Sequence, residues 1–232
     1  MKNEVDFYLQ HTGDIAISPL SKKDLKNLIQ TGEGAFLEFK HKVASPEKIA
    51  REIAAFANSG GGTILIGVSD NGDMIGVEGY HEEEFLLNQA AAEECIPAIA
   101  ITIELLHLGH RDILIVKVPE SDMKPVYVKD KKGRKVFVRR DDESVVASDE
   151  MAQILTAQTS TDEVTFEFGD NEQQLFRFLN EYGEISVERF SILINKTTYT
   201  AAKILVNLVS AGILEMFERD GTELYAFSPK TP

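Results

Sequence analysis

The chain has 232 residues, 43% hydrophobic and 27% charged, a composition that excludes collagen-like, disulfide-scaffold and wholly disordered proteins. The 24 Lys and Arg face 38 Asp and Glu, so the net charge is −14 and the overall field repels phosphate backbones. The single cysteine, Cys95, excludes an internal disulfide and a cysteine-rich zinc site, and no apolar run approaches the roughly 18 residues of a membrane span. We therefore expect a cytoplasmic protein with no membrane segment.

The first predicted module covers residues 21–158 and follows a leader over residues 1–20. Ser21 and Asp24 can form a capping box at the first helix, and the Ser45-Pro46 pair opens the second. Helices are predicted over 21–32, 45–58, 81–95 and 148–158. Strands are predicted over 36–40, 63–68, 74–77, 99–106, 112–118, 126–129 and 136–140. Mixed helices and strands make this an α+β module.

Two of these strands carry informative side-chain patterns. In the first, Leu37 and Phe39 share one face, so Glu38 and Lys40 share the other. Residues 63–68 are continuously apolar, as expected of a strand that is covered on both faces.

A polar linker over 159–166 leads to a second predicted module over 167–232. Helices are predicted around 175–182, from Ser186 to Ile194 and over about 198–210, and a hairpin pairs 213–217 with 224–227. A helix, a helix-turn-helix and a β-hairpin in this order predict a small winged-helix domain.

Four ordered motifs carry a family resemblance: Glu33-Gly34-Ala35-Phe36-Leu37-Glu38-Phe39-Lys40, Ala55-Phe56-Ala57-Asn58-Ser59-Gly60-Gly61-Gly62, Ile66-Gly67-Val68-Ser69-Asp70-Asn71-Gly72 and Ile75-Gly76-Val77. Over about residues 25–147 the chain resembles the Schlafen AlbA-like domain family. The resemblance implies a mixed-sheet AlbA-like fold and a DNA-binding or divergent AAA-type protein. In the family's closing motif a Gly follows the last strand, and Asp141 stands there in this chain.

The same resemblance implies a metal site. Nuclease members of the family cut tRNA or rRNA with two Glu and one Asp around a divalent cation, and the matching residues here are Glu33, Glu38 and Asp70. Mg²⁺ or Mn²⁺ takes such oxygen ligands, and Lys40 could hold a phosphate oxygen or form an ion pair. The alternative is structural: Asp70-Asn71-Gly72 is also a common turn, and Glu33 could be a surface charge.

The glycine-rich segment after the second helix does not predict an ATP site. Gly60-Gly61-Gly62-Thr63 lacks the Lys of a Walker A loop, and Leu65 occupies the third Gly position of a dinucleotide fingerprint. A helix stop followed by a tight turn is the favoured interpretation.

Positive charge is concentrated between residues 117 and 140, where nine basic residues face three acidic ones. With Tyr127 and Phe137 interleaved, this hairpin could follow a phosphate backbone. The alternative is a solvated tip or a Lys-protected sheet edge. The predicted nucleic-acid contacts are Lys129, Lys131, Lys132, Arg134, Lys135, Arg139 and Arg140.

The second module is acidic overall, yet no Asp or Glu occurs from Arg189 to Leu214. The outward face of its third helix is predicted to present residue types that contact phosphates and base edges: Lys196, Tyr199, Thr200, Lys203 and Asn207. The alternative is a winged helix that mediates dimerisation or partner docking.

These patterns favour a DNA-binding transcriptional regulator with an AlbA-like and a winged-helix module. Several Schlafen structures pair two lobes, so a homodimer is expected here, and it would also suit palindromic DNA. The alternatives are a metal-dependent ribonuclease, which would bind RNA, and a protein-interaction module without nucleic-acid binding.

Overall fold

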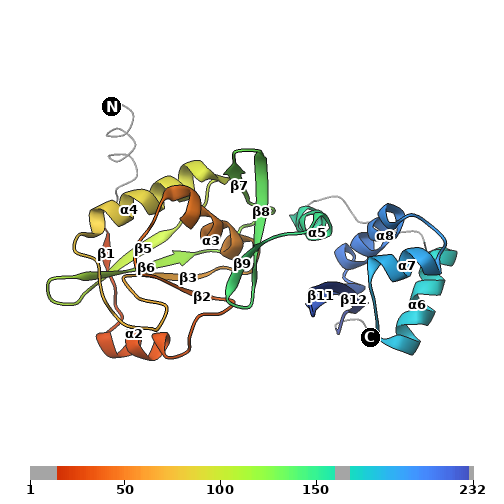
Figure 1. Ribbon diagram of the computed structural model, residues 1–232, viewed down its shortest axis with the longest axis horizontal. Coiled ribbons are helices and arrows are strands. Elements are labelled where there is room, and N and C mark those ends of the chain that lie inside the picture. The colour runs from red at the N-terminus through yellow and green to blue at the C-terminus, as the bar shows by residue number, and fades with distance from the viewer. Residues whose placement is uncertain (1–14, 160–167, 230–232) are drawn as a thin grey trace. The chain divides into compact units, whose positions relative to one another are not determined.

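The computed structural model describes residues 15–159 and 168–229 (Figure 1). Most of the predicted leader and linker therefore lies outside the described residues. The chain divides into two compact units, residues 1–147 and 148–232.

The first unit is built on a five-stranded mixed sheet with the strand order β1-β5-β6-β3-β2. The strands are β1 (Ala16–Ile17), β2 (Leu37–Lys40), β3 (Gly62–Ile66), β5 (Thr102–His107) and β6 (Asp112–Val118). The pairs β1–β5 and β2–β3 are parallel, and β6 runs antiparallel to both of its neighbours. This arrangement confirms the predicted α+β class with a mixed sheet.

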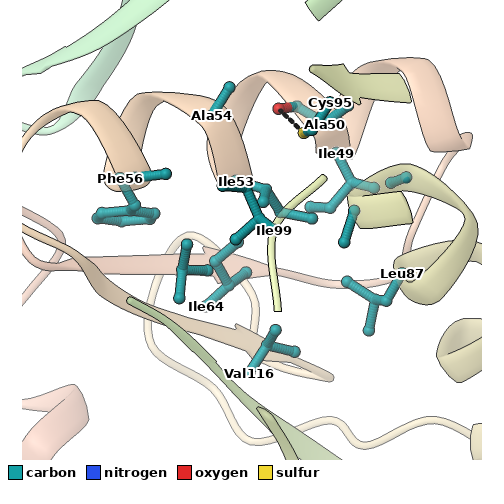
Figure 2. Close-up of a cluster of buried hydrophobic side chains, with 14 of the residues drawn as sticks. Ile49, Ala50, Ile53, Ala54, Phe56, Ile64, Leu87, Cys95, Ile99 and Val116 are labelled. Atoms are coloured by element: carbon teal, nitrogen blue, oxygen red, sulfur yellow. Dashed lines mark hydrogen bonds between the residues drawn. The ribbon is translucent and has the colours of Figure 1, made fainter. Parts of the chain in front are cut away.

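Helices cover both faces of this sheet, with α2 (Lys22–Ile29) on one face and α3 (Pro46–Asn58) and α4 (Tyr80–Gln89) on the other (Figure 1). In β3, Ile64 and Ile66 pack on the α3 side, whereas Leu65 packs on the α2 side. The apolar cluster between α3 and the sheet is drawn in Figure 2. The continuous apolar run is thus explained because both faces of β3 are buried.

The predicted helix starts are confirmed in atomic detail. Ser21 and Asp24 form the capping box of α2, and Ser45 caps α3 with Pro46 in its first turn. These caps satisfy backbone N–H groups that lack a partner within the helix, and the local sequence is enough to encode them.

A second, four-stranded antiparallel sheet packs beside α3, in the order β4-β7-β8-β9. Its strands are β4 (Cys95–Ile96), β7 (Tyr127–Asp130), β8 (Gly133–Arg140) and β9 (Glu143–Val146). The buried side chain of Asn58, at the end of α3, donates to the carbonyls of Val126 (3.0 Å) and Phe137 (2.8 Å) and accepts from the Val126 amide (2.8 Å). One amide group therefore fixes this sheet to the helix.

One predicted strand in the first unit is wrong. Residues 74–77 form no strand, because they make only isolated bridges, from Met74 to Val68 and from Val77 to Asp112. The helix predicted over 81–95 is present as α4, and its last part is a π-helix, η1 (Ala90–Glu94), which ends where β4 begins.

The second unit contains α5 (Asp149–Thr159), α6 (Asp170–Tyr182), β10 (Glu184–Ile185), α7 (Val187–Leu193), α8 (Thr198–Ser210), β11 (Leu214–Arg219) and β12 (Thr222–Phe227). The three predicted helices and the hairpin are present, and the two-residue strand β10 adds a third strand in the order β10-β12-β11. Leu175, Phe190, Leu205 and Tyr225 form the centre of its core. Helix α5, which the sequence assigns to the first module, groups with this unit and contacts α8.

No helix among the described residues is long and apolar enough to cross a membrane.

Candidate nucleic-acid interface

The structure brings three of the predicted carboxylates into one region of the first unit. The pKa of Glu33 is raised, chiefly because the carboxyl group is partly buried. A hydrogen bond from the Phe39 amide to Glu33 Oε1 (2.8 Å) acts in the opposite direction, whereas the negative charges of Glu38 and Asp70 raise the pKa further. Glu33 therefore lies within electrostatic range of both other carboxylates. It reaches them by folding back from the loop before β2 onto the strand's own backbone.

Cations neutralise Glu38, which comes from β2. Its Oε1 pairs with Lys40, and its Oε2 accepts a hydrogen bond from Arg139 Nη1 of β8 at 2.9 Å. Of the two roles considered for Lys40, the structure shows the ion pair. The Glu38 side chain is only 7% exposed, so these bonds offset the cost of burying its charge.

Arg139 is the centre of this network. Its guanidinium also contacts Glu52 of α3 (3.3 Å), Ser144 Oγ of β9 (3.0 Å) and the Gly34 carbonyl (2.8 Å), and it lies over the Phe56 ring at 4.6 Å. Its side chain is 1% exposed. The prediction of Arg139 as a surface contact for nucleic acid is therefore wrong, because the side chain is committed to the interior.

The three carboxylates do not form a metal-binding group. In the described part of the chain, no group of three or more His, Cys, Asp or Glu side chains is arranged so that it could hold a metal ion. Both oxygens of Glu38 already have cationic partners, and Asp70 is exposed in its turn. Binding of Mg²⁺ or Mn²⁺ stays a prediction.

The basic hairpin of β7 and β8 keeps most of its cations at the surface. Lys129, Lys131, Lys132 and Arg134 are exposed, and none of the four has an ion-pair partner among the described residues; Arg140 is also exposed. Lys135, in contrast, pairs with Asp130 at 3.0 Å, and this hydrogen bond lowers the pKa of Asp130. Of the two predicted interleaved aromatic residues, Phe137 is 7% exposed and not available to stack on bases, whereas Tyr127 is half-buried.

The turn after this hairpin's second strand shows why Asp141 can replace the family's Gly. Asp141 has a φ of +51°, in the left-handed region that glycine favours and that Asp tolerates better than most residues. The chain therefore turns into β9 without a glycine at this position.

Helix α8 of the second unit presents the predicted polar face. Thr197 caps the helix through the Thr200 amide. Tyr199 (76% exposed) and Lys203 are exposed, and Thr200 and Asn207 are half-buried. Lys196 is also exposed, but it lies just before the helix and not on it as predicted. Residues 201, 205 and 208 point into the core, which fixes this polar face outward.

Some side chains of these surfaces were not identified from the sequence. Ile192 of α7 is 80% exposed, and the helical phase set by its buried neighbours Phe190 and Ile194 would have predicted this. Ser144 and Glu52 become partners of Arg139 only through contacts between β8, β9 and α3, for which the sequence gives no local signal.

Comparison with known protein families identifies the family to which the chain belongs. The family model described as "Schlafen, AlbA_2" matches residues 33–148, so the chain belongs to the Schlafen AlbA_2 family. Membership of this family indicates a role connected with nucleic acids.

Two solved structures are similar to parts of the chain. One is the N-terminal domain of a protein from Nitrosomonas europaea related to the ATP-dependent DNA helicase RecG, with 26% identity over 56% of this chain and 92% of that domain and a TM-score of 0.42. The other is the DIP2311 protein from Corynebacterium diphtheriae, with 13% identity over 80% of this chain and 35% of that protein and a TM-score of 0.40. A comparison with curated proteins finds no match.

Proposed function

We propose that this protein is a DNA-binding transcriptional regulator, made of an AlbA-like module and a winged-helix module. The observation that supports it best is the surface of α7 and α8, which is free of acidic side chains from residue 189 to 214 in a chain of net charge −14. The order α6, β10, α7, α8, β11, β12 is the order of elements in winged-helix domains, in which the second helix of the helix-turn-helix enters the major groove.

The polar side chains of α8, and Lys196 just before it, suit this role. Lys196 and Lys203 can neutralise phosphates, and neither has an ion-pair partner in the described part of the chain. Tyr199 offers a hydroxyl and an apolar ring that can meet a phosphate or the methyl group of thymine, and Asn207 has the amide that pairs with adenine. Phosphate contacts would orient the helix, and base contacts would select the sequence.

The assembly proposed is a homodimer in the cytoplasm. Two copies of α8 related by two-fold symmetry would contact two half-sites about one helical turn of DNA apart, so a palindromic target is expected. The acidic remainder of the chain would weaken binding elsewhere, and the contacts between exposed cations and phosphates would make affinity fall with salt.

Selection from random duplex DNA, followed by fluorescence anisotropy on the selected site, tests the proposal. We expect the double variant Lys203→Ala, Tyr199→Ala to weaken binding by about tenfold or more, because it removes a phosphate contact and a base contact. Arg177→Ala, which removes an exposed cation from α6, is the control and should bind as the wild type does. Equal binding by the α8 variant and the control would refute the role of α8, and no duplex binding at moderate salt would favour a protein-interaction module.

A metal-dependent ribonuclease that uses Glu33, Glu38, Asp70 and Lys40 is the second candidate. The electrostatic proximity of the three carboxylates favours it, whereas the pairing of Glu38 with Lys40 and Arg139 opposes it. Cleavage of structured RNA that requires Mn²⁺ and is lost in Glu33→Gln would support this candidate. Equal cleavage by the variant would identify a contaminating nuclease.

A further inference from the structure

The β7–β8 hairpin holds two like charges directly opposite each other. The register pairs Lys129 with Arg134, and both side chains are exposed and without an ion-pair partner among the described residues. Like charges opposite each other in an antiparallel pair destabilise the sheet. This hairpin therefore carries an electrostatic cost, and no ion pair of Lys129 or Arg134 within the described chain offsets it.

The opposite face of the same hairpin is different. Side chains alternate between the faces, so Val128, Asp130 and Lys135 lie on one face and Lys129 and Arg134 on the other. Lys135 pairs with Asp130, Val128 is buried, and Phe137 packs toward α3, with the Arg51 guanidinium 5.7 Å from its ring centre. This inner face is packed and its charges are balanced.

The turn extends the charge of the outer face. Lys131 and Lys132 occupy the turn between the strands, and both are exposed. Four cations thus fall within residues 129–134, and the one acid of that segment, Asp130, is engaged by Lys135 on the inner face. Cations held this close together suit a ligand whose negative charges repeat at short intervals, and a phosphodiester backbone is such a ligand.

We propose that the outer face of the β7–β8 hairpin, formed by Lys129, Lys131, Lys132 and Arg134, binds the phosphate backbone of duplex DNA without reading its sequence. The four side chains are Lys and Arg alone, and the hairpin's aromatic rings offer little surface for base stacking, because Tyr127, on the same face, is half-buried and Phe137, on the inner face, is buried. This inference rests on the proposed DNA-binding function but concerns the first unit, which would then supply its own contact.

The test is a salt titration of duplex binding by the double variant Lys129→Gln, Arg134→Gln. The slope of log K against log salt is negative, and each lost phosphate contact reduces its magnitude by about 0.9. We therefore expect the slope to become shallower by about 2, equally on specific and random duplexes. The control is Lys135→Gln with Arg111→Gln, which also removes two cations from the first unit, but from ion pairs with Asp130 and Glu78. Its slope should equal that of the wild type.

A thermal melt adds a readout that does not depend on DNA. Removing the opposed charges should leave the melting temperature of the outer-face variant unchanged or higher, while its DNA binding weakens. Equal salt slopes for the outer-face and control variants would refute the inference, as would a structured RNA that binds more tightly than duplex DNA. If Lys203→Ala with Tyr199→Ala has no effect while the hairpin variant does, the role of α8 fails and the hairpin contact stands; a wild type that binds no nucleic acid refutes both.

Discussion

Replacing Arg139 with Met is the most direct test of how the AlbA-like unit is held together. The guanidinium joins β2, α3, β8 and the loop at Gly34, and it does so with a side chain that is 1% exposed. Met has a similar length and fills much of the same space without any charge. The substitution therefore isolates the electrostatic role of the side chain from its volume.

The expected loss of stability follows from the groups that Met leaves unpaired. Removing one partner of a buried ion pair costs about 3–5 kcal/mol, because the other charge stays buried without compensation. In the variant, Glu38 still pairs with Lys40 through Oε1, and Glu52 still accepts the hydrogen bond from Ser144. We therefore expect a loss of stability at the lower end of this range, about 3 kcal/mol. Since domains are stable by about 5–15 kcal/mol, this is a large fraction of the total.

Urea unfolding followed by circular dichroism measures this loss as a change in the free energy of unfolding. The double variant Arg139→Met, Glu38→Gln removes both charges and should recover part of the loss. Arg111→Met, at an exposed ion pair with Glu78, is the control and should change stability by less than about 0.5 kcal/mol. A loss below about 1 kcal/mol for Arg139→Met, or a double variant less stable than the single one, would refute the role of this network.

Two further substitutions test buried polar groups. The Tyr225 hydroxyl is buried without a hydrogen-bond partner among the described residues, so Tyr225→Phe should stabilise the second unit by about 1 kcal/mol in urea unfolding; a loss of stability would reveal an unrecognised partner. Burial raises the pKa of Glu83 above 4.5, so its contribution to stability is complete below pH 4.5 and is lost as pH rises through the folded-state pKa. Glu83→Gln should therefore gain stability relative to the wild type between pH 4 and pH 7, and an offset independent of pH would contradict this.

The elements predicted correctly from the sequence are those fixed by neighbouring residues. The capping box at Ser21, the Ser45-Pro46 helix start and the doubly buried strand at 63–68 depend on interactions or periodicities within a few residues. Sequence patterns carry this information directly, and the structure confirms these features with shifts of a few residues at the element ends.

The elements that were missed depend on partners far along the chain. Strand β4 exists because Cys95 and Ile96 pair with β7 more than 30 residues later, and β1 exists because it pairs with β5. Two-residue strands have no periodicity that could be recognised, so only the tertiary pairing defines them. The burial of Arg139 has the same origin, since it requires Glu38, Glu52 and Ser144 to meet from three other elements.

Ion pairing and burial also reduce the number of cations that are available to a ligand in the basic segment between residues 117 and 140. Counted along the sequence it has a surplus of six positive charges, but Lys117, Lys124 and Lys135 pair with nearby acids and Arg139 is buried. Arg140 is exposed but has a partner of its own, so the exposed cations without an ion pair in the described chain reduce to the four of residues 129–134. Four phosphate contacts would give a salt slope of about −3.6, so the hairpin alone supports weak binding that salt easily disrupts. High affinity at physiological salt would then require α8, or a second copy of the chain, on the same duplex.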